Sequence, residues 1–122
     1  MRKLLTIFLF LVGLAPAFPA IAHHSGAMFD RSKTVTLEGV VKEYKFAAPH
    51  TWIQVVIQQG GAPVTWAVEG GAPARMKAAN LGPDVIKVGD KVTIRAHPLR
   101  DGRFGGSFID IKLPNGEVIK PL

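Results

Sequence analysis

The sequence has no cysteine among its 122 residues. This absence excludes disulfide bonds, thiolate metal ligands and a cysteine nucleophile. The chain also has no Ser/His/Asp set and no pair of carboxylates whose spacing indicates catalysis, and it contains no internal repeat or low-complexity segment. We therefore expect a domain that is held together by packing alone and that is not an enzyme.

Long apolar runs are absent except at the N-terminus. Residues 4–14 are almost entirely apolar, follow two basic residues and lead into a small-residue segment that ends in Ala20-Ile21-Ala22. These are the three parts of a secretory signal peptide, with cleavage after Ala22. The alternative is a membrane anchor, but the run is shorter than the ~20 residues that span a bilayer, and Pro16 and Pro19 interrupt its end. We predict a leader over residues 1–22, a periplasmic or secreted protein, and no membrane span after cleavage.

The charge of the chain is modest and dispersed. Its formal net charge is +6, and removal of residues 1–22 leaves 13 basic against 9 acidic residues, a net charge of +4. Such a surface favours solubility and weak attraction to anions, but it does not indicate nucleic acid as a partner. The 100 residues that remain suffice for one domain with a modest core.

Alternation of apolar and polar residues predicts a chain made mainly of strands. Gly39, followed by a change of phase after Val41, indicates a bulge or bend in the first strand. In the fifth strand Ile109, Ile111 and Leu113 are expected inside. The predicted strands cover residues 34–46, 51–59, 64–69, 92–97 and 107–113, with an Asn-Gly turn into a short final strand and one short helix over residues 73–80.

The order of these elements is three strands, a short helix and two further strands. With a bent first strand, this is the layout of an oligonucleotide/oligosaccharide-binding (OB) barrel. We predict an all-β, OB-like barrel of five to six strands over residues 35–122, preceded by an N-terminal arm over residues 23–34. A small β-sandwich is the alternative fold.

Several short motifs resemble those of a known family. Ala22-His23-His24-Ser25, Pro49-His50-Thr51-Trp52 and Glu69-Gly70-Gly71 are similar to segments of small exported bacterial proteins of unknown function, whose mature chains open on A-H-H-S. The resemblance implies a periplasmic location and an OB-like barrel. It implies no activity, substrate or catalytic residue.

The predicted cleavage point suggests a metal site. Cleavage there leaves a free amine on His23, and this amine and the imidazole Nδ1 can chelate one ion, an arrangement similar to the histidine brace of copper proteins. His24, His50 and His97 are candidate further ligands, and Met28 is a softer one. Nitrogen ligands without thiolate suit copper first, and zinc or nickel less well. The alternative is a polar tail whose histidines bind nothing.

A second hypothesis is a binding module for an anionic small molecule, a glycan or a peptide end. Trp52 can stack on a ligand, and Arg100 and Arg103 can hold a carboxylate or phosphate through paired hydrogen bonds. Phe104 and His50 are expected nearby, because OB barrels commonly bind ligands at these loops.

The metal hypothesis needs two geometric conditions. His50 follows the first predicted strand and His97 ends the fourth, and we expect the two histidines to face each other at one end of the barrel. The arm must then run back along the barrel to bring His23 to that end. We interpret Glu69, beside the glycine pair, as a surface or structural contact.

Overall fold

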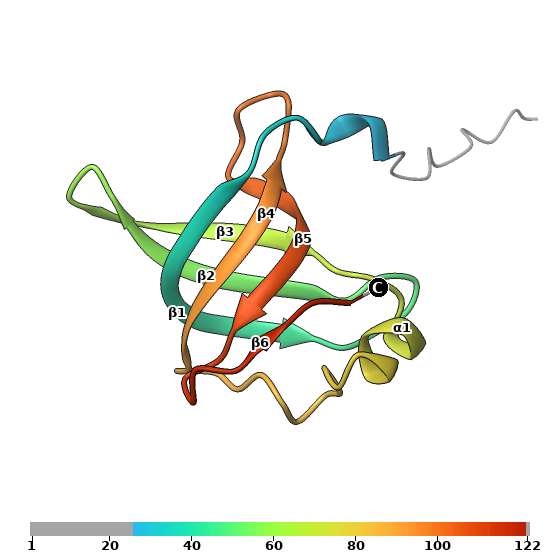
Figure 1. The fold of residues 1–122 in the computed structure, drawn as a ribbon. Coiled ribbons are helices and arrows are strands. Elements are labelled where there is room, and N and C mark those ends of the chain that lie inside the picture. The colour runs from blue at the N-terminus through green and yellow to red at the C-terminus, as the bar shows by residue number, and fades with distance from the viewer. Residues whose placement is uncertain (1–25, 122) are drawn as a thin grey trace, which may run out of the picture.

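Six strands, a short α-helix and a single 3-10 turn make up residues 26–121, the part of the chain that the computed structural model describes (Figure 1). The elements are η1 (Gly26–Met28), β1 (Val35–Lys45), β2 (Trp52–Gln59), β3 (Ala62–Glu69), α1 (Pro73–Ala78), β4 (Lys91–Pro98), β5 (Gly105–Lys112) and β6 (Val118–Ile119). The predicted leader, His23 and His24 lie outside the described residues. Within residues 26–121, no helix has both the length and the apolar character needed to cross a membrane.

The strands form one sheet that closes on itself. Their order is β3-β2-β1-β4-β5-β6, with antiparallel neighbours. β3 and β5 then pair in parallel, with Ala67 opposite Gly105 and Glu69 opposite Ser107, so that five strands make a barrel and β6 extends it (Figure 1). Because the sheet closes through β3 and β5, the sandwich alternative is wrong. With α1 between β3 and β4, the closed sheet confirms the predicted OB-like barrel.

β1 is a bent strand that pairs with β2 on one side and with β4 on the other. Gly39 stands opposite both Ile57 of β2 and Val92 of β4, and the register with β2 shifts between Val41 and Glu43, which confirms the predicted bulge. A Cβ atom at Gly39 would overlap the carbonyl oxygen of Val56. Only glycine therefore allows β1 to approach β2 this closely.

The core consists of inward-facing side chains of the long strands, which fill the barrel. Met76 of α1, with Leu81 and Ile86 of the segment after it, covers one end. One predicted orientation in β5 is wrong. A second register shift, opposite Arg95 and Ala96, makes Ile109 the extra residue of a bulge and packs Phe108 against the core instead. The buried members of the core are Leu37, Val41, Ile53, Val55, Trp66, Val68, Met76, Leu81, Ile86, Val92, Ile94, Ala96, Ile111, Leu113 and Ile119.

The hydroxyl group of Tyr44 joins β1 to the segment after α1 and gives a testable pH dependence. It donates a hydrogen bond to the carbonyl oxygen of Leu81 at 2.8 Å, and burial raises the pKa of Tyr44 to about 12. The folded pKa lies above the ordinary value of 10.0. The contribution of this group to stability is therefore complete below pH 10 and is lost as the pH rises toward 12.

Tyr44 is the single tyrosine of the chain, so its ionisation is directly visible in the near-ultraviolet absorbance. We expect the phenolate signal of the native protein to rise at a higher pH than that of the protein in urea, and Tyr44→Phe to abolish the signal. Coincident native and unfolded titrations would contradict this environment for Tyr44.

Candidate functional site

The pocket that concentrates titratable side chains lies between η1 and α1, on the side of the barrel where β3 meets β5. We call it the η1–α1 pocket, and its volume is about 470 Å³. A cavity of this size accepts a small ligand. Its polar side chains are Arg31, His50, Glu69, Arg75 and Ser107, and its apolar wall includes Phe29, Phe108, Ile109 and Pro121.

His50 and Glu69 form an ordered pair in this pocket. His50 Nδ1 is hydrogen-bonded to Glu69 Oε1, and the side chain of Glu69 is 8% exposed while that of His50 is 46% exposed. Nδ1 is the one ring nitrogen of His50 that has a hydrogen bond within the described part of the chain. A carboxylate that holds one imidazole nitrogen fixes the ring and leaves Nε2 for a ligand, as in many metal sites.

Backbone hydrogen bonds between the start of β2 and the end of β3 create this pair. Thr51 is fully buried, and both its backbone N–H and its hydroxyl group donate to the carbonyl oxygen of Gly71, each at 3.0 Å. Gly70 N–H donates to the carbonyl oxygen of Thr51 at 2.8 Å, and a Cβ atom at Gly70 would overlap Thr51 Oγ1. This packing brings His50 against Glu69.

Two arginines border the pocket from different elements. The guanidinium group of Arg31 lies close to Gly26 in η1, and the alkyl chain of Arg75 of α1 packs on Gly71. Neither arginine forms an ion pair with another described residue. Ser107 adds a hydroxyl group from β5. Among residues 26–121 the pocket therefore holds two positive charges without an ion-pair partner, while its one carboxylate is engaged by His50.

The N-terminal arm reaches this pocket. Phe29 is buried and bridges to Leu99, Asp30 N–H donates to the carbonyl oxygen of Pro98 at 2.8 Å, and Arg100 N–H donates to that of Met28 at 2.9 Å. These bonds hold the arm along the β4–β5 loop, and Gly26 and Phe29 line the pocket beside His50. The described part of the arm thus lies at the end of the barrel where β4 ends and β1 begins, and it contributes Gly26, Phe29 and Arg31 to the pocket.

His97 does not join His50, contrary to our prediction. Because β1 and β4 are antiparallel with Val35 opposite Ala96, the end of β4 lies beside the start of β1. His97 Nδ1 is accordingly hydrogen-bonded to the carbonyl oxygen of Lys33 at 2.8 Å, and His97 does not line the pocket. Within residues 26–121, no group of three or more His, Cys, Asp or Glu side chains could hold a metal ion.

A neighbouring recess of about 270 Å³ gathers the aromatic candidates. It brings Trp52, Phe104 and Arg103 together, as the second hypothesis expects, and Met28 lines it as well. Phe29 and Glu69 line both this recess and the η1–α1 pocket, so the two are adjacent.

Arg100 and Arg103, however, already have partners. Arg100 Nε donates to the carbonyl oxygen of Ala27 at 3.0 Å, and Arg103 Nε donates to Asp101 Oδ2 at 2.7 Å. The hydrogen bonds from Arg103 lower the pKa of Asp101. The arginines that are available to a ligand are instead Arg31 and Arg75, which the sequence analysis did not single out.

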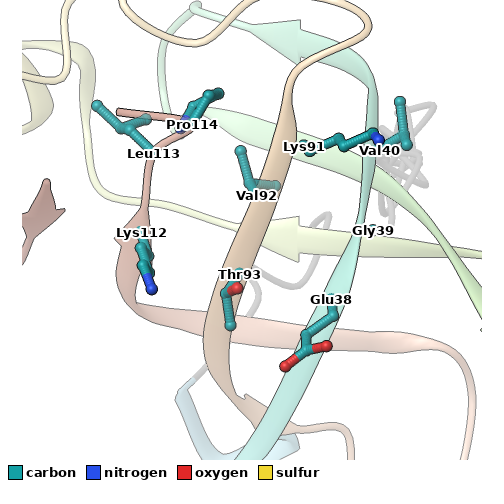
Figure 2. Close-up of a pocket in the computed structure, with 9 residues that line it drawn as sticks. All are labelled: Glu38, Gly39, Val40, Lys91, Val92, Thr93, Lys112, Leu113 and Pro114. Atoms are coloured by element: carbon teal, nitrogen blue, oxygen red, sulfur yellow. The ribbon is translucent and has the colours of Figure 1, made fainter. Parts of the chain in front are cut away.

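A third hollow, of about 510 Å³, lies over β1, β4 and the end of β5 (Figure 2). Its charged side chains are Glu38, Lys91 and Lys112, and Figure 2 shows the first and last of these on either side of Thr93. It contains no histidine and no arginine. The η1–α1 pocket is therefore the better candidate site.

The pairing of His50 with Glu69 has a signal in the sequence. β2 and β3 form a hairpin about Gly60-Gly61, with Gln59 opposite Ala62 and Trp52 opposite Glu69. Counting outward from the two glycines thus places Glu69 opposite Trp52, two residues from His50 and therefore on the same face of the hairpin. No comparable count finds Arg31 or Arg75, because the arm and α1 are not paired with β2.

Comparisons with known proteins agree with the fold. No curated protein matches this sequence. The mitochondrial single-stranded DNA-binding protein Rim1 of S. cerevisiae is structurally similar, with a TM-score of 0.51 and 12% identity over 66% of this chain and 92% of that chain. At this identity the similarity shows the fold alone. The model of the family of unknown function DUF6152 matches residues 12–108, and the chain belongs to that family.

Proposed function

We propose that this protein is an exported binding protein that holds a copper-type transition metal ion in the η1–α1 pocket. His50 Nε2 would be one ligand, and the amine and imidazole of the mature N-terminal residue His23 would be others. The observation that carries the proposal is the hydrogen bond from His50 Nδ1 to the buried carboxylate of Glu69. Such a carboxylate orients the ring and raises the basicity of the coordinating nitrogen.

The path of the arm supports a contribution from the N-terminus. Gly26 lines the pocket, and His23 is three residues before it. Three extended residues span up to about 10 Å. Because Gly26 and His50 line the same pocket, this reach favours a contribution from the N-terminal histidines.

Further features favour a soft or borderline cation. Imidazole and amine ligands without thiolate suit copper first, and zinc or nickel less well. Glu69 Oε2 is buried without a hydrogen-bond partner among the described residues. A buried oxygen of this kind costs about 1–3 kcal/mol, and nearby positive charge offsets part of that cost.

The binding of another ligand in the aromatic recess is our second candidate. The packing of Trp52, Phe104 and Arg103 around one recess favours it. It ranks lower because Arg103 is paired with Asp101 and Arg100 with the arm.

The test of the metal proposal compares the mature chain, which starts at His23, with the same chain extended by one alanine. The extension removes the chelating amine and changes no residue of the barrel. We expect it to weaken Cu²⁺ binding by at least roughly tenfold, the lower end of what the loss of a supporting group costs a metal site. Competition against a chelator of known affinity measures the change.

His97→Ala is the matched control, because His97 does not line the pocket and its Nδ1 is bonded to the carbonyl oxygen of Lys33, so its loss should leave the Cu²⁺ affinity unchanged. Equal affinities for the extended and mature chains would show that the N-terminal amine is not a ligand. Mass spectrometry of the exported protein must also give a chain that starts at His23. Any other start contradicts this form of the site.

A further inference from the structure

The two arginines give the η1–α1 pocket a charge that suits an anion. Its two guanidinium groups, Arg31 and Arg75, come from the arm and from α1, and neither has an ion-pair partner among residues 26–121. The carboxylate of Glu69 is buried and engaged by His50. The nearby Asp30 is held by Ser32 and Lys33, and these contacts lower its pKa.

We infer that the η1–α1 pocket binds a small oxyanion, a carboxylate or a phosphate, between Arg31 and Arg75. A guanidinium group presents parallel N–H donors that match two oxygens of a carboxylate or phosphate, and such charge-assisted pairs are the stronger hydrogen bonds of proteins. The hydroxyl group of Ser107 supplies a further donor on the β5 wall. Carboxylates and phosphates both present two neighbouring oxygens that can accept these paired hydrogen bonds.

Each of the two arginines packs against a glycine at the edge of the pocket, Arg31 against Gly26 and Arg75 against Gly71. At Gly26 a Cβ atom would lie 3.1 Å from an Arg31 nitrogen, and at Gly71 it would lie 3.2 Å from the side chain of Arg75. The end of the Arg31 guanidinium group and the alkyl chain of Arg75 are therefore each packed against a glycine. Because this packing already restricts each arginine side chain, the side chain loses less conformational entropy when it binds an anion.

The anion site deepens the proposed function, and it also stands apart from it. A bare cation beside two guanidinium groups is repelled, so an anion bound to them would stabilise the metal ion. By linkage, the metal would strengthen anion binding by the same factor. Arg31, Arg75 and Ser107 are not proposed metal ligands, so anion binding can be measured on the metal-free protein.

The experiment titrates metal-free mature protein with malonate and, separately, with inorganic phosphate, by isothermal calorimetry at constant ionic strength. We expect saturable 1:1 binding, and the tighter of the two probes identifies the anion class. Arg31→Gln and Arg75→Gln should each weaken it by roughly tenfold or more, as expected for hydrogen bonds to a charged group. Both side chains are exposed, so unchanged thermal midpoints should show that the variants fold.

Arg103→Gln is the control, since it removes the same charge from a side chain outside this pocket. Its affinity should stay within about twofold of the parent, because Arg103 is exposed and already paired with Asp101, so its charge is compensated and screened. Equal losses in all three variants would show nonspecific attraction, and a loss confined to Arg103→Gln would place the anion in the aromatic recess. Either result, or no saturable binding, overturns the inference.

The alanine-extended chain separates the two proposals. It lacks the chelating amine but keeps Arg31 and Arg75, so it should bind the preferred anion as the mature chain does. If Cu²⁺ binding fails in every form while anion binding persists, the metal proposal is wrong and the anion site remains. If the extended chain loses the anion, the N-terminus and not the arginine pair carries binding.

Discussion

A mature chain with His50→Ala is expected to bind Cu²⁺ more than 100-fold more weakly than the parent. His50 is the histidine of residues 26–121 whose Nδ1 is held by a carboxylate inside the η1–α1 pocket. Its loss removes a ligand from the pocket. The expected effect therefore exceeds the roughly 10–100-fold cost of losing a group that only orients a ligand.

Glu69→Gln separates the two members of the pair. The amide keeps the size of the side chain and can still hydrogen-bond His50, but it lacks the charge that raises the basicity of the ring. We expect a loss of roughly 10–100-fold with the imidazole ligand retained, so that the nitrogen couplings in the electron paramagnetic resonance spectrum persist. In His50→Ala those couplings should change. Parent-like Cu²⁺ affinity in His50→Ala would show that the metal, if bound, lies elsewhere.

Gly39→Ala should be among the most destabilising single changes in the barrel. The new Cβ atom would overlap the carbonyl oxygen of Val56 and press on the side chain of Ile57 at 2.9 Å. Gly39 is paired to both β2 and β4, so β1 cannot move away from one neighbour without disturbing the other. Overpacking costs typically 1–3 kcal/mol, and a backbone obstacle places this site at about 3 kcal/mol or more.

Thermal unfolding measures this effect. For a domain of this size each kcal/mol shifts the midpoint by about 4–8 °C, so Gly39→Ala should lower it by roughly 12 °C or more. Gly82→Ala is the matched control, because nothing lies within 4 Å of a Cβ atom there and its φ is not positive. We expect that control to stay within about 0.5 kcal/mol of the parent. Similar midpoints for the two variants would contradict the close approach of β1 to β2.

Much of the fold could be predicted because it depends on local patterns. Alternation along β4 puts Val92, Ile94 and Ala96 inside, as the structure confirms. The bulge in β1 follows from Gly39 and the phase change after it. The prediction for β5 was wrong at Ile109, because its bulge arises from pairing with β4 and has no marker in β5 itself.

The candidate site was less predictable, since its members come from separate elements. Sequence patterns do not distinguish one exposed arginine from another. The contacts show that Arg100 and Arg103 are partnered, whereas Arg31 and Arg75 have no ion-pair partner in the described part of the chain. His97 was wrongly placed with His50 because the distance between them depends on the course of β1 around the barrel. Glu69 was undervalued, although hairpin register would have located it.

By itself, the sequence determined an all-β chain with its strands in order, one short helix, a glycine-marked bend and no thiol chemistry. These features follow from the types of residue present and from the alternation of apolar and polar residues along each strand. Both are local, because they depend only on residues that are close in the sequence. The tertiary structure alone decided that His50 is held by Glu69, that the arm lies along the β4–β5 loop, and that two arginines beside them have no ion-pair partner within residues 26–121. The physical reason is barrel closure: the pairing of β3 with β5 and the docking of the arm join residues that are distant in sequence, and no local pattern encodes those distances.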